Sequence, residues 1–100
     1  MRRIDYAPEA KDDLEQIFAY LDEHSTSAAA KLAERINQRV GIAAAHPSIG
    51  RDRSFLSEGM RSVVVEKYVI FFRFTDTVLE IIRVLHGSRD IDSIFEADAN

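Results

Sequence analysis

Two stretches of the 100-residue chain repeat their hydrophobic residues with the period of an α-helix. In residues 8–24, acidic residues surround an apolar stripe made of Ala10, Leu14, Ile17, Phe18 and Leu21. A second stripe follows residues 25–27, whose Ser and Thr are candidate N-caps, and it stops at Pro47. Because the joint is so short, the pattern predicts an antiparallel helical hairpin. Gly41 costs the second helix about 1 kcal/mol relative to alanine, which predicts a close approach of another segment there.

The pattern changes to that of β-strands in the second half of the chain. Three apolar runs, residues 59–66, 68–74 and 78–85, are rich in Val, Ile or Phe and are separated by short polar joints. The middle run is apolar at nearly every position, which predicts a central strand covered on both faces. In the last run, regular alternation would place Val78, Ile82 and Val84 on one face and Leu79, Ile81 and Leu85 on the other. Residues 2–6 alternate weakly and predict a short edge strand.

These elements predict one two-layer α+β domain over residues 1–96. Its order is β-α-α-β-β-β, with the helical hairpin packed on a mainly antiparallel sheet, because the sheet is the only apolar surface available to cover the hairpin. Residues 47–54 form a turn-rich connector. After the last strand, Ile91, Ile94 and Phe95 are spaced for a short C-terminal helix that docks on the core. Residues 97–100 are expected to be a frayed acidic tail.

Composition narrows the function classes. The chain has 13 basic and 17 acidic residues and a net charge of −4, whereas proteins that bind nucleic acid through its phosphates usually have a clear basic excess. Direct sequence-specific binding to nucleic acid is therefore not expected. No window approaches the roughly 18 apolar residues of a membrane span, so no membrane partner is expected. The absence of cysteine excludes disulfides and thiolate chemistry and fits a cytoplasmic location.

Neither a cofactor nor a metal is predicted, because no two histidines have metal-ligand spacing and Gly87-Ser88 is too little for a phosphate loop. The polar exit of the last strand is the best place to look for function, since backbone groups and charges become available there. The simpler interpretation of His86 is a hydrogen bond to the turn that follows it, and Arg89 and Asp90 more simply fix that turn.

Two arginines alternate with apolar residues on the predicted strands. Arg73 and Arg83 are expected to pair with Glu66 or Glu80 across the sheet, and the alternative is that they rim a binding face.

Several motifs occur in order along nearly the whole chain. They are Pro8-Glu9-Ala10, Pro47 with Gly50-Arg51, Gly59-Met60-Arg61, residues 68–73 and, as the most specific, Arg83-Val84-Leu85-His86-Gly87-Ser88-Arg89-Asp90. Together they resemble the ParE branch of the RelE/ParE superfamily of toxin–antitoxin systems. The resemblance implies a plasmid-stabilisation toxin that poisons DNA gyrase by a contact that is not enzymatic. It also implies neutralisation by a ParD-like antitoxin, in a possible hetero-oligomer with it.

The RelE branch of the superfamily implies a different activity, cleavage of messenger RNA on the ribosome. Of the basic residues that those nucleases use, only Arg61 and Arg89 can be carried over, and Phe95 has no hydroxyl where they usually place a Tyr. Two arginines stabilise charge but do not transfer protons. We therefore predict no catalytic residue and no enzyme activity, and keep a nuclease that uses these two arginines as the first alternative. The second alternative is a non-toxic member that only binds an antitoxin and regulates its operon.

Two candidate surfaces follow. An antitoxin segment that folds on binding is expected to lie in an apolar groove between the helical hairpin and the sheet. The candidate antitoxin-binding residues are Phe18, Leu21, Leu32, Ile36, Arg61 and Arg73. The candidate target-binding residues are Arg83, His86, Arg89 and Asp90.

Overall fold

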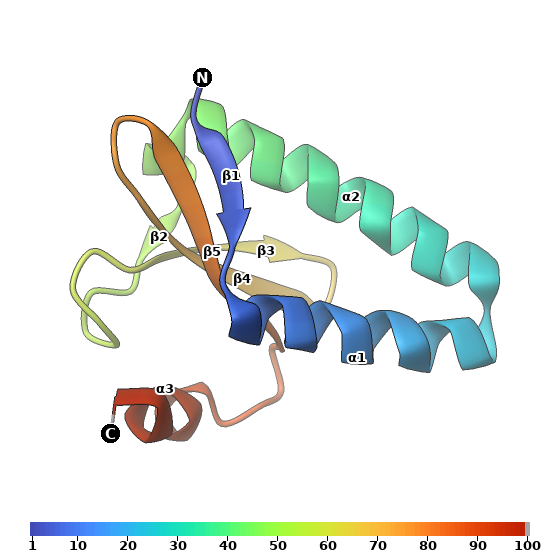
Figure 1. Ribbon diagram of the computed structural model, residues 1–100. Helices are drawn as coiled ribbons and strands as arrows, with labels where there is room; N and C mark the ends of the chain where they lie inside the picture. Colours follow the sequence, from blue (N-terminus) through green and yellow to red (C-terminus); the bar gives the residue numbers. More distant parts are fainter. Residues whose placement is uncertain (100) are drawn as a thin grey trace.

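The computed structural model of the protein describes the backbone of residues 1–99 and the side chains of residues 1–96. Its elements follow one another as β1 (Arg3–Tyr6), α1 (Pro8–His24), α2 (Thr26–Ala45), the 3-10 helix η1 (Pro47–Ile49), β2 (Arg51–Asp52), β3 (Arg61–Val65), β4 (Tyr68–Phe74), β5 (Val78–His86) and α3 (Ile91–Ala99) (Figure 1). The α+β fold with a helical hairpin and a C-terminal helix is confirmed. The connector, predicted only as turn-rich, also contains the two-residue strand β2.

The strands form one sheet in the order β1-β5-β4-β3-β2. Neighbouring strands are antiparallel except β1 and β5, which run parallel, with Arg3 opposite Val78 and Tyr6 opposite Ile81. The first strand of the chain therefore lies beside the last one, at the edge of the sheet (Figure 1). The central strand is β4, as its continuous apolar sequence predicted.

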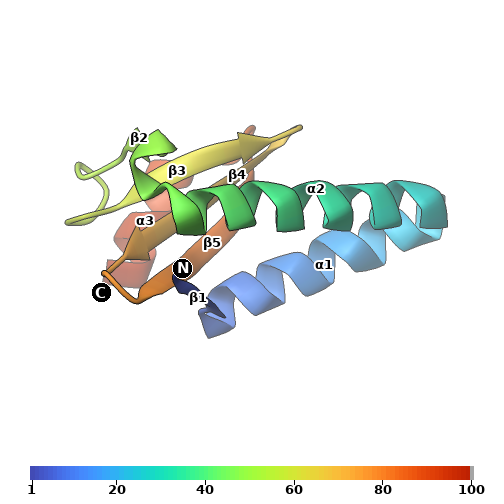
Figure 2. The ribbon, with the colours of Figure 1, turned by 90° about the horizontal axis from the view of Figure 1, so that it is seen from above.

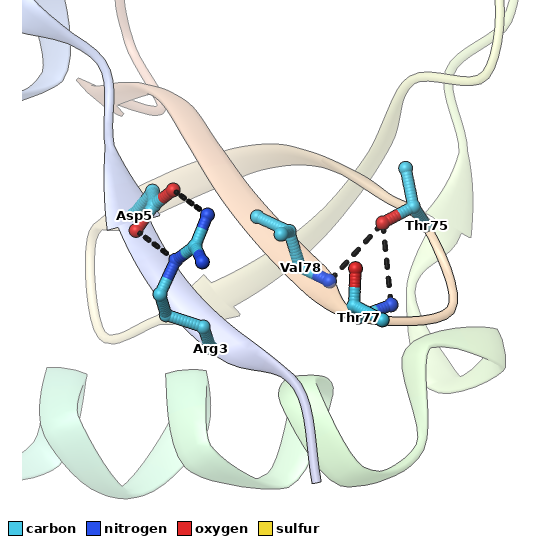
Figure 3. A network of polar contacts seen from close by, with 5 residues as sticks. All are labelled: Arg3, Asp5, Thr75, Thr77 and Val78. Atoms are coloured by element: carbon cyan, nitrogen blue, oxygen red, sulfur yellow. Dashed lines mark hydrogen bonds and ion pairs between the residues drawn. The ribbon is translucent and has the colours of Figure 1, made fainter.

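Two groups of polar contacts lie near this edge of the sheet, one within β1 and one within the β4–β5 turn (Figure 3). The backbone N–H of Arg3 donates to the carbonyl of Thr77 at 2.9 Å. In the β4–β5 turn, the Thr75 hydroxyl accepts the backbone N–H groups of Thr77 and Val78 at 3.3 and 3.1 Å. Next to the turn, the guanidinium of Arg3 donates to Asp5 at 3.0 Å and lowers the pKa of that carboxyl, chiefly through this hydrogen bond.

Each face of the sheet covers a separate core. The α1–α2 hairpin packs on one face, where the largest fully buried side chains include Leu32, Ile70 and Phe72. Helix α3 packs on the other face through Phe95, whose ring meets that of Phe71 edge to face at a centroid distance of 4.9 Å. Figure 2 shows the sheet between the hairpin and α3. The docking of α3 is the role that its apolar spacing predicted.

A β-bulge interrupts the alternation of side chains along β5. Phe71 lies opposite Arg83 and Phe72 opposite Ile81, so Ile82 is an extra residue without a counterpart on β4. Leu79, Ile81 and Val84 therefore pack on the hairpin side, while Ile82 and Leu85 pack on the α3 side. The predicted alternation along this strand is wrong beyond the bulge.

Gly41 and Gly50 differ in how much space surrounds them. An added Cβ at Gly41 would meet nothing within 4 Å, so the close approach predicted there is wrong. At Gly50 an added Cβ would lie 2.5 Å from Cζ of Phe72, a ring with no solvent exposure. The close contact is therefore at Gly50, where the connector crosses the core.

The acidic tail predicted to fray, residues 97–100, overlaps the end of α3. The helical backbone continues to Ala99, and Asn100 lies outside the described residues.

Candidate functional site

A groove of about 790 Å³ opens between the α1–α2 hairpin and the sheet. It lies where the hairpin passes the β3–β4 turn and the end of β5. The lining residues are Gln16, Ile17, Tyr20, Leu21, Ala28, Leu32, Glu66, Lys67, Tyr68 and His86. Its volume falls within the roughly 300–1,000 Å³ range of ligand-sized pockets, although this one is a surface groove.

The floor of the groove is apolar because both helices turn part of their stripe toward it. Ile17 and Leu21 are half-buried side chains of α1, and Leu32 is a buried side chain of α2. Tyr20 on the α1 side remains 61% exposed, so the groove already presents an aromatic surface to water. Exposed apolar area in a concave surface is typical of a protein–protein contact site.

The sheet side of the groove is polar and well organised. The rings of Tyr68 and His86 meet edge to face with centroids 5.5 Å apart. Burial, with smaller contributions from Tyr20 and Glu66, raises the pKa of the Tyr68 hydroxyl above its ordinary value. At the rim, Arg35 of α2 donates to Glu66 at 2.5 Å and ties the hairpin to the β3–β4 turn.

Two local features of the strands create this wall. A two-residue turn joins β3 to β4, with Glu66 in the left-handed region at a φ of 54°, so the turn is short enough to project Glu66 and Lys67 at the rim. The bulge at Ile82 puts Val84, and with it His86 two residues later, on the hairpin side of β5. Nδ1 of His86 accepts the backbone N–H of Ser88 at 3.1 Å, which confirms the predicted hydrogen bond to the following turn.

The residues predicted to bind an antitoxin fall into two groups. Leu21 and Leu32 line the groove, whereas Phe18 is half-buried against the core and Ile36 is a core residue with 3% exposure. Arg61 and Arg73 lie elsewhere on the surface: Arg61 donates to the carbonyl of Gly50 at 2.8 Å. Arg73 donates to the carbonyl of Glu58 at 3.1 Å and to the hydroxyl of Ser57, and so holds the β2–β3 loop.

The residues predicted to bind the target are also separated. His86 lines the groove, while the carboxylate of Asp90 accepts the backbone N–H and hydroxyl of Ser93 and caps the start of α3. The backbone N–H of Arg89 donates to the carbonyl of His86 at 3.0 Å. Arg89 itself is exposed.

Arg83 makes a two-pronged ion pair with Asp13 of α1, at 2.8 and 2.9 Å, in place of the predicted pairing with Glu66 or Glu80. The same carboxylate accepts the backbone N–H of Val84 at 3.0 Å. Strand β1 ends opposite Ile81, so Asp13 satisfies the edge of β5 beyond the point where β1 stops. The predicted pairing of Arg73 with Glu66 or Glu80 is likewise not seen among the described residues: Glu66 pairs with Arg35, and Arg73 bonds to the β2–β3 loop.

The pair of arginines carried over from the nucleases is not assembled. Arg61 begins β3 and Arg89 follows the end of β5, which is level with Val65 at the other end of β3. Four residues of strand separate these levels by about 13 Å. Among the described residues there is no group of three or more His, Asp or Glu side chains that could hold a metal ion.

Several groove residues were missed by sequence reasoning. Gln16, Tyr20, Lys67 and Tyr68 come from three different elements, and nothing in their local sequence indicates that they meet. Ile17 was identified as part of the apolar stripe of α1, yet that stripe does not show which of its members cover the core and which remain at an open surface.

The comparisons with known proteins agree with this architecture. The family described as "ParE toxin of type II toxin-antitoxin system, parDE" matches residues 4–91. The chain belongs to this family and is a ParE-type toxin of a type II toxin–antitoxin system. The protein named Toxin ParE1 in two strains of Mycobacterium tuberculosis, CDC 1551 / Oshkosh and ATCC 25618 / H37Rv, is 28% identical over 88 residues, which cover 86% of this chain and 90% of each relative.

Solved structures share the fold at lower sequence identity. A chain from the chromosomal ParDE TA system of P. aeruginosa superimposes with a TM-score of 0.69 at 21% identity, over 86% of this chain and 96% of that one. YafQ from E. coli strain BL21(DE3) gives a TM-score of 0.52 at 17% identity, over 88% and 96% of the two chains. None of the helices in the described part of this protein is long and apolar enough to cross a membrane.

Proposed function

We propose that the chain inhibits DNA gyrase by binding to it and that a ParD-like antitoxin neutralises it by folding a segment into the groove beneath the α1–α2 hairpin. The gyrase part rests on membership of the ParE family, whose members are understood to act in this way. The antitoxin part rests on the groove itself, an apolar concave surface with an exposed aromatic ring. An amphipathic helix in such a groove is a common mode of peptide recognition.

The arrangement of the polar residues supports binding in preference to catalysis. In-line attack on an RNA backbone needs a base, an acid and charge stabilisation at one place. Arg61 begins β3 and Arg89 follows β5, whose end is level with the other end of β3, while Asp13 engages Arg83 and Asp90 caps α3. The likeness of a ParDE chain from P. aeruginosa supports the assignment of an antitoxin partner.

The test uses purified chain in a supercoiling assay with DNA gyrase and a parallel assay for the cleaved gyrase–DNA complex. We expect inhibition, or accumulation of the cleaved complex, and reversal when the protein from the neighbouring antitoxin gene is added. Substitution of Leu21→Lys in the groove should weaken reversal by the antitoxin and leave gyrase inhibition in place. A matched control, Ile42→Lys, changes an exposed apolar residue of α2 outside the groove and should affect neither.

Other outcomes point to the alternatives. Cleavage of messages during translation that is lost in Arg61→Ala would replace this proposal with the nuclease. Normal growth of cells that express the chain without its antitoxin would favour a non-toxic family member. Absence of any gyrase effect at micromolar chain would refute gyrase as the target.

A further inference from the structure

Strand β1 leaves one edge of the sheet open. It stands last in the strand order, with β5 on one side and no strand on the other (Figure 1). The backbone N–H groups of Arg3 and Ala7 donate to carbonyls of β5. Because successive residues of a strand turn their N–H and C=O groups to opposite sides, those of Ile4 and Tyr6 point outward. The edge is therefore a row of donors and acceptors on which another strand can pair.

The two faces of β1 carry different kinds of side chain. Ile4 and Tyr6 pack against the core on the hairpin side, so Arg3 and Asp5 project from the opposite face. These two charged side chains contact each other at 3.0 Å and keep 70% and 45% of their exposure (Figure 3). On β5, Glu80 lies beside Asp5 in the register of the sheet, which places a like charge next to this carboxylate. A cation on the open side of Asp5 would offset that repulsion.

We propose that two copies of the chain pair antiparallel through the outer edges of their β1 strands, with Ile4 opposite Ile4 of the second copy. This register puts Arg3 opposite Asp5 of the second copy, and two-fold symmetry repeats the same contact on the other side. The outward-pointing residues all fall in hydrogen-bonded pairs, Ile4 with Ile4 and Tyr6 with Arg2. The pairing forms about six N–H···O bonds, and each charge of one strand meets its opposite on the other.

Charge selects this register over its neighbours. A shift of two residues puts Arg3 opposite Arg3 in one direction and Asp5 opposite Asp5 in the other, and both are like-charge pairs. A shift of one residue matches an outward-pointing residue with an inward-pointing one, so the hydrogen bonds cannot form. Charged side chains usually discourage pairing at an edge strand, but opposite signs two residues apart make this edge complementary to itself. Arg2 donates to backbone carbonyls of the β4–β5 turn and of α2, at 2.6 and 3.1 Å, and so fixes the start of the strand.

The paired edge is small and separate from the groove. A few residues from each copy bury far less than the roughly 1,200 Å² of a stable interface, so we expect a dissociation constant on the order of 100 µM. The residues that line the groove come from α1, α2, the β3–β4 turn, β4 and β5. The pairing therefore does not depend on the antitoxin, and it goes beyond the proposed function.

Charge reversal tests the pairing. Sedimentation equilibrium of the purified chain, from about 10 µM to about 1 mM, should show wild type passing from monomer to dimer. Arg3→Asp and Asp5→Arg should each weaken the dimer by roughly tenfold, because each puts two like-charge pairs across the symmetric interface. The two variants change the net charge in opposite directions, so an effect of net charge cannot weaken both. An equimolar mixture should regain the dimer, since the two carboxylates of one variant then face the two arginines of the other.

Further variants and a second measurement serve as controls. Arg3→Asp/Asp5→Arg restores opposite charges across the interface and should dimerise like the wild type. Asp22→Arg, an exposed substitution on α1, makes the same charge change as Asp5→Arg and should leave the association constant unchanged. Circular dichroism checks that every variant is folded. In hydrogen exchange, the amide protons of Ile4 and Tyr6 should become more protected as the concentration rises, because only these gain a partner.

The results separate the possibilities. A wild-type chain that stays monomeric up to about 1 mM overturns the proposal. A dimer that neither single reversal weakens forms through another surface, and also overturns it. If both reversals weaken the dimer and their mixture does not regain it, Arg3 does not face Asp5 and the register is refuted. None of these results bears on gyrase inhibition or on antitoxin binding in the groove.

Discussion

Replacing Asp13 with alanine tests whether one carboxylate closes the edge of the sheet. Asp13 and Arg83 keep only 12% and 14% of their side-chain exposure, and Asp13 also accepts the N–H of Val84. Breaking a buried ion pair costs about 3–5 kcal/mol, and an unsatisfied buried N–H costs about 1–3 kcal/mol. Because the remaining exposure lets water replace part of both contacts, we expect Asp13→Ala to lower the free energy of unfolding by about 2–4 kcal/mol.

Urea unfolding followed by circular dichroism measures this change, with the slope of the transition checked for constancy. In a thermal scan the same loss corresponds to a fall in Tm of roughly 10–25 °C for a domain of this size. Asp13→Asn keeps one acceptor for Val84 and should cost less than alanine. Asp12→Ala, at the exposed neighbouring position, should change the free energy by no more than about 0.5 kcal/mol. A loss below about 1 kcal/mol for Asp13→Ala would show that the contact does not hold α1 to β5.

Three further predictions concern stability. Gly41→Ala should raise the free energy of unfolding by about 0.5–1 kcal/mol in urea, because the helix gains a better former and the added Cβ meets nothing within 4 Å; a loss would mean that the site is not open. Gly50→Ala should lower the free energy of unfolding by about 1–3 kcal/mol in the same assay, because the added Cβ would lie 2.5 Å from the buried Phe72 ring. An unchanged midpoint of urea unfolding would contradict this contact. Burial raises the pKa of Tyr6, so its hydroxyl loses the proton at a lower pH in the unfolded chain than in the folded one. The free energy of unfolding should therefore fall as pH rises above about 10. The fall should be shallower in Tyr6→Phe, and identical pH profiles of the two proteins would disprove the contribution of Tyr6.

Periodicity was enough to predict most of the fold. The stripe of α1 and α2 and the apolar runs of β3, β4 and β5 each extend over several residues, so the period of burial is visible in the sequence. Strand β2 escaped because its two polar residues have no period at all. The bulge at Ile82 could not be predicted, because this sequence places apolar residues on both faces of the sheet whether the strand is regular or bulged.

The candidate site was less predictable, since it depends on contacts between distant parts of the chain. Leu21 and Leu32 were identified as groove residues because both belong to the apolar stripes of the two helices, and these stripes have few members. Arg83 was expected to pair with Glu66 or Glu80 across the sheet, whereas its partner Asp13 lies 70 residues away on α1. Local sequence gives no information about such a partner. For Gly41 and Gly50 the error had the same origin, because the space around a glycine belongs to the packed structure.

The parallel pairing of β1 with β5 bears on how the protein emerges from the ribosome. Residues 3–6 have no partner strand until residues 78–81 have left the exit tunnel, and the groove lacks a wall until His86 follows them. A nascent chain can form the helical hairpin early, but the hairpin has no sheet to pack on until β3, β4 and β5 have emerged. The groove is complete only after the whole of β5 has emerged, long after both of its helices.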